Sequence, residues 1–355
     1  MPDLIVAGAG MAGLCAAAHA RERGAEVVVL EKTSRPGGSM LLSSGFVWRH
    51  RELDDFRAEC PAGDPGLQQA IFDRLDADLD WLEKLGAPVL ERETGNPLTA
   101  GRRYDPAGLT DALACAAGDV RLEVGLRELP PGTPVVLATG GFQGDRDLVR
   151  EHITRHADDL VLRAAPGSTG DGLRLGLRAG ARTSDGLDEF YGRNMPATPQ
   201  TLRPEDFVSE SQLYARHATV RNARGETFET RTWSEIDVVQ WTARQPDARA
   251  WYSIAEEDLD LRVRERTVGE MIERAERAGA PVVRDSGTVT VEVVAAITTT
   301  LGGLRIDEHA RAAPGVYVAG ADAGGIATGG YASGLAAALV FGRIAAESAL
   351  ADAAA

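Results

Sequence analysis

The sequence contains few cysteines and no excess of basic residues. Its three cysteines, Cys15, Cys60 and Cys115, lie far apart and form no C-x-x-C pair, which argues against a disulfide framework and a thiolate metal site. Lys and Arg number 38 against 53 Asp and Glu, which gives a formal net charge of −15. Binding to a phosphate backbone needs a basic surface, and anionic lipids repel an acidic one. We therefore expect no metal ion, no nucleic-acid partner and no membrane partner.

Long apolar runs are also missing. No segment reaches the roughly 18 consecutive apolar residues of a membrane-spanning helix. The first residues lack the basic segment and apolar stretch of a signal peptide, so we expect a cytoplasmic protein. The 355 residues instead include 40 glycines and 44% hydrophobic residues. This composition is typical of a globular α/β protein with room for two domains.

Four short apolar runs predict buried parallel strands, because strands buried on both faces are continuously apolar. They are residues 4–7, 27–30, 135–138 and 316–319. Each run is followed by glycines, and more than 300 residues separate the first from the last. A helix is predicted between the second and third runs, where Asp64 and Pro65 form a typical helix start and Gly86 a typical end.

The simplest architecture is a Rossmann-like α/β domain built from both ends of the chain. We expect it to comprise residues 1–186 and 298–355. A smaller α+β cap domain, residues 187–297, would be inserted between them, because this stretch has more Trp, Arg and Glu and few glycine turns after strands.

The turn after the first strand has the sequence G-A-G-M-A-G at residues 8–13. Gly8 permits a tight turn, Gly10 lets the backbone approach a pyrophosphate, and Gly13 lets helix and strand pack closely. Met11 and Ala12 open the following helix, whose N-terminal N–H groups attract an anion. This pattern predicts a pyrophosphate site.

Glu31 ends the second strand, 18 residues after Gly13. A carboxylate at this place can accept hydrogen bonds from both ribose hydroxyls of an adenosine. A strand, a glycine turn, a helix and this acid together predict a dinucleotide-binding site, which a glycine-rich turn alone would not.

The continuation at residues 31–39 (EKTSRPGGS) resembles the E-K-x4-G-G segment of FAD-dependent flavoproteins of the succinate dehydrogenase and fumarate reductase family. Five further segments resemble that family in the same order, with Phe46 replacing a glycine and Asp322 standing where most members carry Glu. They are residues 42–48 (LSSGFVW), 81–86 (WLEKLG), 136–142 (VLATGGF), 169–172 (TGDG) and 315–325 (GVYVAGADAGG).

The resemblance implies FAD as the cofactor. Asp322 would accept hydrogen bonds from the ribityl chain, and Ser333 would begin a helix whose positive end faces the flavin N1. No His or Cys lies in an attachment context, so we expect non-covalent FAD. The expected cofactor-binding residues are Gly8, Gly10, Met11, Ala12, Gly13, Glu31, Lys32, Gly37, Gly38, Ser39, Ser44, Gly45, Ala138, Thr139, Gly140, Asp171, Gly320, Asp322, Ser333, Gly334 and Leu335.

The family's shared reaction, hydride transfer that interconverts CH–CH and C=C, sets the expected chemistry. Fumarate reductases carry a His where this chain has Thr299, and an Arg after the last strand where residues 326–331 have none. The cap segment 225–230 also lacks the family's Arg and Glu. Two carboxylates cannot be desolvated without charged partners, so a C4-dicarboxylate substrate is not expected.

Tyrosines remain near the expected pocket, as on the 3-ketosteroid Δ1-dehydrogenase side of the family. Tyr331 or Tyr191 would exchange a proton with the substrate, and Arg193 would polarise its carbonyl-type group. Each tyrosine could equally be buried against a backbone carbonyl, and Arg193 could be solvated or paired. We expect an FAD-dependent dehydrogenase or reductase that acts on a bulky neutral small molecule.

A separate electron donor or acceptor is expected, because no second G-x-G-x-x-G follows another strand. Two alternatives stay open. One is a redox-neutral flavoprotein of the isomerase or cyclase type, and the other is a flavin monooxygenase.

Overall fold

The computed structural model describes residues 2–198 and 202–354. The chain divides into two compact units: the first comprises Met1–Asp145, Ala165–Glu189 and Thr299–Ala355, and the second comprises Arg146–Ala164 and Phe190–Thr298. The predicted boundaries after residues 186 and 297 lie within three residues of the observed ones. Residues 146–164, placed in the first domain by the sequence, belong instead to the second unit, because β8 (Val161–Leu162) pairs with that unit's long strand β16 (Thr288–Thr300).

The first unit is built on a six-stranded sheet that contains all four predicted strands. Its order is β17 (Arg311–Ala313), β18 (Val316–Val318), β7 (Val135–Leu137), β1 (Leu4–Ala7), β2 (Val27–Leu30) and β6 (Asp119–Arg121). Only the edge strand β17 is antiparallel to its neighbour. The prediction that the two ends of the chain build one parallel sheet is confirmed. The carboxyl ends of its parallel strands lie at one edge of the sheet, and the predicted cofactor turns follow there.

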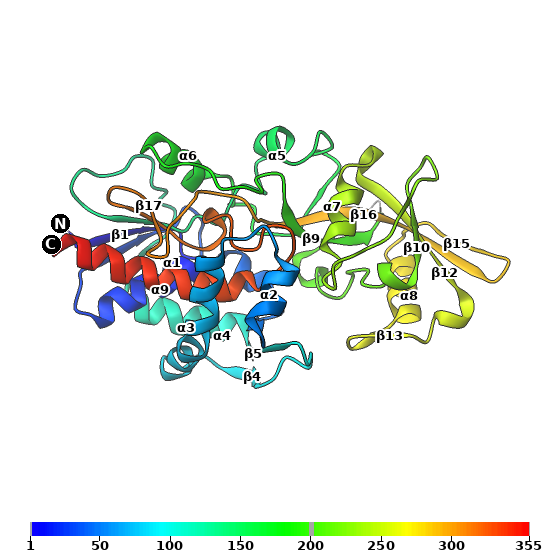
Figure 1. The fold of residues 1–355 in the computed structure, drawn as a ribbon, viewed down its shortest axis with the longest axis horizontal. Coiled ribbons are helices and arrows are strands. Elements are labelled where there is room, and N and C mark those ends of the chain that lie inside the picture. Colours follow the sequence, from blue (N-terminus) through cyan, green and yellow to red (C-terminus); the bar gives the residue numbers. More distant parts are fainter. Residues whose placement is uncertain (1, 199–201, 355) are drawn as a thin grey trace. The chain divides into compact units, whose positions relative to one another are not determined.

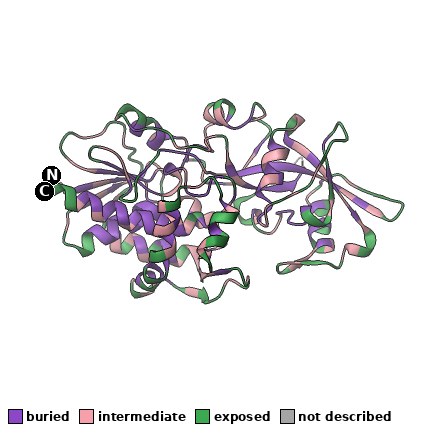
Figure 2. Cartoon of the chain, viewed as in Figure 1, coloured by how far each residue is buried: buried purple, intermediate pink, exposed green. Residues whose placement is uncertain are grey.

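Helices α1 (Met11–Glu22) and α9 (Gly334–Ala353) pack against this sheet, and α4 (Pro106–Ala117) packs against α1. Figure 1 shows α1 and α9 side by side, and Figure 2 shows that both are largely buried. A side chain at Gly342 of α9 would place its Cβ 2.5 Å from the backbone oxygen of Ala12, so this close packing needs glycine. Among the described residues, α9 alone is long and apolar enough to span a membrane, but 61% of its most apolar window is buried within the protein.

The predicted helix after Asp64 is α3 (Pro65–Lys84), which packs against α9. The side chain of Asp64 accepts hydrogen bonds from the N–H groups of Gly66 and Leu67, as expected of a helix cap. The buried face of α3 includes Leu75, Leu79 and Leu82. The remaining elements of the first unit are η1 (Gly38–Leu42), β3 (Phe46–His50), α2 (Leu53–Glu59), β4 (Val89–Glu91), β5 (Thr99–Tyr104), α6 (Asp171–Arg178) and η6 (Gly320–Asp322).

The second unit is a mostly antiparallel sheet with helices packed against it. Its sheet has the order β11 (Thr227–Phe228), β10 (Thr219–Arg221), β12 (Arg249–Ala255), β16 and β15 (Val282–Asp285), with β8 and β9 (Phe190–Pro196) also paired to β16. The core of this unit includes Tyr252, Met271 and Val291. Its other elements are α5 (Arg146–His152), η2 (Pro204–Asp206), η3 (Ala215–His217), α7 (Ile236–Ala243), η4 (Pro246–Ala248), η5 (Glu256–Asp258), β13 (Arg262–Val263), β14 (Arg266–Thr267) and α8 (Val268–Arg277).

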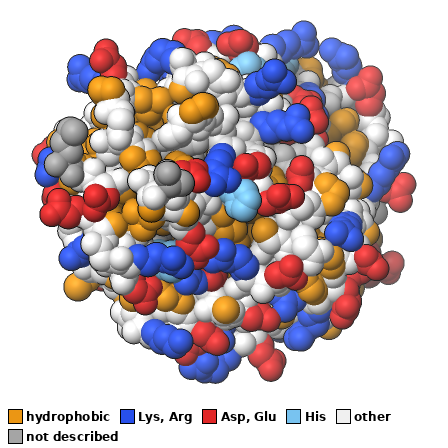
Figure 3. Space-filling view, turned by 60° about the vertical axis from the view of Figure 1, so that its left-hand side comes forward, with side chains coloured by type: hydrophobic (Ala, Val, Ile, Leu, Met, Phe, Trp, Pro, Cys, Tyr) orange, Lys and Arg blue, Asp and Glu red, His pale blue; other side chains and the backbone are white. Residues whose placement is uncertain are grey.

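The surface carries charges of both signs. On the face drawn in Figure 3, acidic and basic side chains are interspersed and form no basic stripe. This distribution is unlike the clustered lysines and arginines of a nucleic-acid-binding face.

Candidate functional site

The glycine turn between β1 and α1 is packed too closely for side chains at two of its three glycines. A Cβ at Gly8 would lie 2.2 Å from the backbone oxygen of Ala138, and Gly8 has a φ of +103°. A Cβ at Gly13 would lie 1.9 Å from the backbone oxygen of Gly8. These two glycines therefore serve the turn and the helix–strand packing, as the sequence predicts.

Gly10 differs from them because no atom lies within 4 Å of where its Cβ would be. The backbone of Gly38 borders the same space, since its own Cβ would lie 3.5 Å from the Cα of Gly10. Helix α1 begins here with no side-chain cap, and its first backbone hydrogen bond runs from the N–H of Leu14 to Gly10. The space beside Gly10, at the start of α1, is thus an open cradle. Such a cradle fits the pyrophosphate of a dinucleotide.

Glu31 lies at the end of β2 with 8% of its surface exposed. One carboxylate oxygen accepts a hydrogen bond from the N–H of Ala9 at 2.8 Å. The other accepts from the N–H of Thr33 at 2.8 Å and from its hydroxyl at 2.7 Å. A carboxylate has about four acceptor sites, so these three bonds leave room for a ribose hydroxyl.

Lys32 joins two of the predicted motifs. Its Nζ donates hydrogen bonds to the hydroxyl of Thr169 and to the carboxylate of Asp171, both at 2.7 Å. The contact draws the T-G-D-G turn and the N-terminus of α6 to the end of β2. Both Lys32 and Asp171 were predicted to bind the cofactor. In the structure they form an ion pair with each other, and their contacts with FAD stay a prediction.

Asp322 lies just after β18 and is 1% exposed. Its carboxylate accepts hydrogen bonds from the N–H of Thr139 at 2.5 Å, from the Thr139 hydroxyl at 3.1 Å and from the N–H of Gly141 at 2.9 Å. Burial raises the pKa of Asp322, and these donors partly offset that effect. The residue predicted to hold the ribityl chain thus also fixes the turn after β7.

Ser39, Ser44 and Gly45 follow the glycine pair 37–38. The hydroxyl of Ser39 accepts from the N–H of Ala165 at 3.0 Å. A Cβ at Gly45 would lie 2.0 Å from the backbone oxygen of Tyr104, and Gly45 has a φ of +80°. Only glycine fits at this turn, which leads directly into β3.

The N-terminus of α9 is capped by Ser333, whose hydroxyl accepts from the N–H of Ala336 at 3.3 Å. The same hydroxyl donates to the backbone oxygen of Phe46 at 3.5 Å. No atom lies within 4 Å of a Cβ built on Gly334, and Leu335 is half-buried. The positive end of this long helix therefore borders open space, as a flavin-facing helix requires.

An aromatic group lies beside this helix in the first unit. The rings of Tyr331 and Trp48 are edge to face, 6.0 Å apart, and Trp48 and His50 are 5.4 Å apart. Burial lowers the pKa of His50. Trp48 and His50 were not among the predicted site residues. The signal that could have identified them is their place directly after the S-S-G-F turn.

Tyr191 and Arg193 belong to β9 of the second unit. The Arg193 residue is 6% exposed, and its guanidinium carbon lies 5.0 Å from the centre of the Tyr191 ring. The Nη1 of Arg193 donates a hydrogen bond to the backbone oxygen of Ser234. Burial would raise the pKa of Tyr191, but the charges of Arg193, Arg163 and Arg264 outweigh it and lower the pKa to about 8. The sequence did not indicate Arg163 or Arg264.

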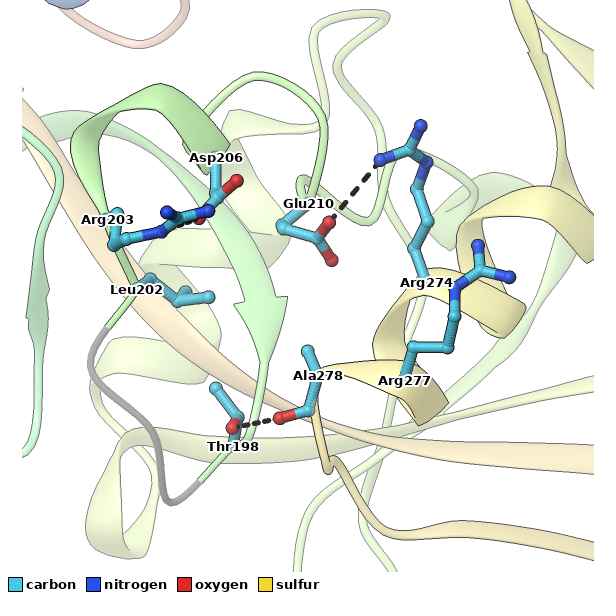
Figure 4. A pocket seen from close by; sticks show the side chains of 8 residues that line it. All are labelled: Thr198, Leu202, Arg203, Asp206, Glu210, Arg274, Arg277 and Ala278. Atoms are coloured by element: carbon cyan, nitrogen blue, oxygen red, sulfur yellow. Dashed lines mark hydrogen bonds and ion pairs between the residues drawn. The ribbon is translucent and has the colours of Figure 1, made fainter.

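The second unit also holds a cavity of about 370 Å³. It is lined by Thr198, by residues of the segment 202–210 and by the end of α8 with Ala278 (Figure 4). Arg203 is paired with Asp206 at 3.1 Å, and Arg274 lies 3.6 Å from Glu210. Because its arginines already have carboxylate partners, the cavity has the character of a solvated ion-pair cluster. It contains no predicted site residue.

No group of three His, Cys, Asp or Glu side chains that could hold a metal ion occurs within residues 2–198 and 202–354.

Comparison with known proteins identifies the family. A family model described as an FAD binding domain matches residues 3–124 and 132–335. A fumarate reductase (cytochrome) from Shewanella frigidimarina is 24% identical over 232 residues, which cover 52% of this chain and 40% of that protein. The chain spans less than half the length of the curated relatives it matches.

Two solved structures share the fold over nearly the whole chain. The open conformation of a flavocytochrome c3 fumarate reductase has a TM-score of 0.72 and 20% identity, covering 99% of this chain and 78% of that one. The 3-ketosteroid Δ1-dehydrogenase from Sterolibacterium denitrificans has a TM-score of 0.72 and 15% identity, covering 99% of both chains. The chain belongs to the FAD binding domain family, with FAD as its cofactor, and the predicted likeness to flavoproteins of the succinate dehydrogenase and fumarate reductase family is confirmed.

Proposed function

We propose that the protein is an FAD-dependent oxidoreductase that interconverts CH–CH and C=C next to a carbonyl-type group of a bulky neutral substrate. The proposal is supported by its similarity to proteins named fumarate reductase and 3-ketosteroid Δ1-dehydrogenase. The main structural support for the proposal is the packing of the Arg193 guanidinium group over the Tyr191 ring. When bound, FAD supplies hydride transfer with one substrate carbon.

Tyr191 is the proton-transfer residue in this proposal. Removal of a hydride from one carbon leaves the neighbouring carbon to lose a proton, and the Tyr191 phenolate accepts it. In the opposite direction the phenol donates the proton. An acid or base works best when its pKa is near the working pH, and the pKa of Tyr191 is about 8. Arg193 stabilises the phenolate from the face of the ring.

A neutral substrate is supported by the residues of the first unit. Trp48 and Tyr331 are half-buried aromatic side chains, and no Arg stands in residues 326–331. In the second unit, the guanidinium groups of Arg193 and Arg163 donate to the backbone oxygens of Ser234 and Phe207. These two N–H groups are already hydrogen-bonded within the protein.

Electrons would pass to or from a separate small molecule or protein. The cysteines Cys15, Cys60 and Cys115 are all free, which suits the proposed cytoplasmic location, where thiols stay reduced.

Replacement of single tyrosine hydroxyls tests the assignment. Tyr191→Phe is expected to lower kcat/KM by about 10²–10⁴-fold, the usual contribution of a general acid or base. Tyr214→Phe is the matched control, because the buried Tyr214 hydroxyl has no hydrogen-bond partner among the described residues. The rate is followed as loss of flavin colour under anaerobic conditions. Full activity in Tyr191→Phe would remove Tyr191 from this role and leave Tyr331, tested in the same way.

A further inference from the structure

Arg163 and Tyr191 approach the same stretch of β16 from opposite sides. On one side, Leu162 of β8 pairs with Ile297, and the N–H of Arg163 donates to the Ile297 oxygen at 2.8 Å. On the other side, a Cβ at Gly192 would lie 2.0 Å from the oxygen of Ala296, so Tyr191 also follows this stretch. Strands lie about 4.8 Å apart, which puts the two backbones on the order of 10 Å from each other. Both long side chains can bridge such a separation.

The guanidinium group of Arg163 is held in place by two acceptors. Its Nε donates to the backbone oxygen of Phe207 at 3.0 Å, and its Nη1 donates to the hydroxyl of Thr298 at 3.0 Å. The side chain is half-buried. Its charge is therefore fixed at the end of β16, unlike that of an arginine extended into solvent.

We propose that Arg163 is a positioning residue of the acid–base site, which places a fixed positive charge beside the Tyr191 hydroxyl. The proposal rests on the role proposed for Tyr191. Arg163 acts through Tyr191 and is given no contact with substrate or flavin. Its effect is to favour the phenolate, the form that accepts the substrate proton.

The charges that lower the pKa of Tyr191 come from three elements. Arg193 belongs to β9 itself, Arg163 follows β8, and Arg264 lies in the turn between β13 and β14, where its φ is +58°. Arg193 lies over the ring, and Arg163 is held by contacts independent of the ring. Removal of Arg163 is therefore expected to change the charge beside Tyr191 and to leave the Arg193–Tyr191 packing in place.

The test is a titration of Tyr191 in the FAD-loaded protein, labelled with carbon-13 at the tyrosine Cζ and observed by NMR. Tyr191→Phe identifies the signal. Arg163→Gln is expected to raise the pKa of Tyr191 by about one unit or more, because an opposite charge nearby shifts a pKa by about 1–3 units. Arg163→Lys keeps the positive charge, so the pKa of Tyr191 should stay close to its low wild-type value. Arg155→Gln, at an exposed position of the same unit, is the control and should leave it unchanged.

Thr298→Val provides a second variant should Arg163→Gln not fold. It removes the acceptor of Nη1 and keeps the shape of the side chain, so it should move the pKa of Tyr191 upward by a smaller amount. An unchanged pKa in Arg163→Gln, or in Thr298→Val if the first does not fold, overturns the proposal for Arg163 alone. A wild-type Tyr191 that titrates at its ordinary value would instead remove the proposed acid–base role of Tyr191.

Discussion

The carboxylate of Asp322 accepts hydrogen bonds from both the backbone N–H and the hydroxyl of Thr139, at 2.5 Å and 3.1 Å, across 183 residues of sequence. It accepts a third from the N–H of Gly141. These bonds join the turn after β18 to the turn after β7, so the two halves of the predicted cofactor edge are held by one buried side chain.

Asp322→Ala is expected to destabilise the protein by about 3 kcal/mol or more, since each buried donor left without a partner costs about 1–3 kcal/mol. Asp322→Glu introduces the residue that most members of the resembled family carry. The Asp322 carboxylate is already tightly packed against Gly172, because a Cβ built on Gly172 would lie 2.2 Å from one of its oxygens. The added methylene should cost about 1–3 kcal/mol through overpacking. Urea unfolding of the flavin-free protein measures both values. A loss below about 0.5 kcal/mol for Asp322→Ala, the range of ordinary surface substitutions, would contradict this role.

Glu31→Gln is expected to weaken FAD binding. The variant keeps the size of the side chain and replaces one carboxylate oxygen, an acceptor from Ala9 or Thr33, by an N–H2 donor. A hydrogen bond to a charged group contributes about 1.5–3 kcal/mol, so the Kd for FAD should rise by about 10–100-fold. The fluorescence of released FAD measures the Kd. The exposed Glu26 provides the control variant Glu26→Gln, whose Kd should equal that of the wild type.

Replacement by alanine should affect two glycines of one turn differently, one in FAD affinity and the other in stability. A methyl group at Gly10 meets no atom within 4 Å, so Gly10→Ala should fold normally and lose FAD affinity, because the methyl enters the proposed pyrophosphate space. A methyl group at Gly13 would lie 1.9 Å from a backbone oxygen, so Gly13→Ala should lose stability. Thermal unfolding of the flavin-free variants and their FAD titrations distinguish these effects. Normal FAD binding by Gly10→Ala would place the pyrophosphate elsewhere.

A buried ion pair between α3 and α9 sets part of the stability of the first unit. Asp78 is 1% exposed and pairs with Arg343, whose guanidinium carbon also lies 4.7 Å from the Trp81 ring centre. Above pH 6, where Asp78 is ionised, Arg343→Met should destabilise the protein by about 3–5 kcal/mol, because it removes the hydrogen-bond donor and nearest charge from a buried carboxylate. The double variant Asp78→Asn/Arg343→Met should recover part of that loss. Additive losses in the double variant would show that the two side chains do not interact.

The same pair predicts a pH dependence. Burial raises the pKa of Asp78 from 3.8 to about 6, although Arg343 and Arg74 act against it. A raised pKa means that the folded state binds the proton more tightly, so the stability contribution of Asp78 is complete below pH 3.8 and is lost as the pH rises through about 6. The free energy of unfolding of Asp78→Asn, compared with the wild type, should therefore improve between pH 4 and pH 7. A difference that stays constant over this range would contradict the raised pKa.

The sequence predicted the parallel sheet and the turns of the cofactor edge because both have local signals. Continuous apolar runs predict buried strands, and the glycine positions reflect contacts such as Gly13 with Gly8, which lie a few residues apart. Residues 146–164 were assigned to the wrong unit because β8 has two residues and its partner β16 lies over 120 residues away. No local pattern indicates such a pairing.

The neighbours of the two predicted catalytic tyrosines, Tyr191 in the second unit and Tyr331 in the first, were predicted only in part. Tyr191 and Arg193 are close in sequence and share a strand, so their proximity could be expected. Arg163 acts on Tyr191 only because both follow β16, which depends on the sheet topology. Trp48 and His50 form an aromatic row because alternate residues of β3 face the same side, a feature that becomes informative only once the strand is known.

The decisive test of the proposed reaction is anaerobic mixing of the FAD-loaded protein with saturated cyclic ketones, and of its reduced form with the matching α,β-unsaturated ketones. The visible absorbance of the flavin is followed in both cases. The proposed reaction predicts loss of colour with a saturated ketone, or its return with an unsaturated one, in step with formation of the other ketone and far slower in Tyr191→Phe. Product formed while the flavin spectrum stays constant, or flavin spectra that no member of either series changes, would contradict it.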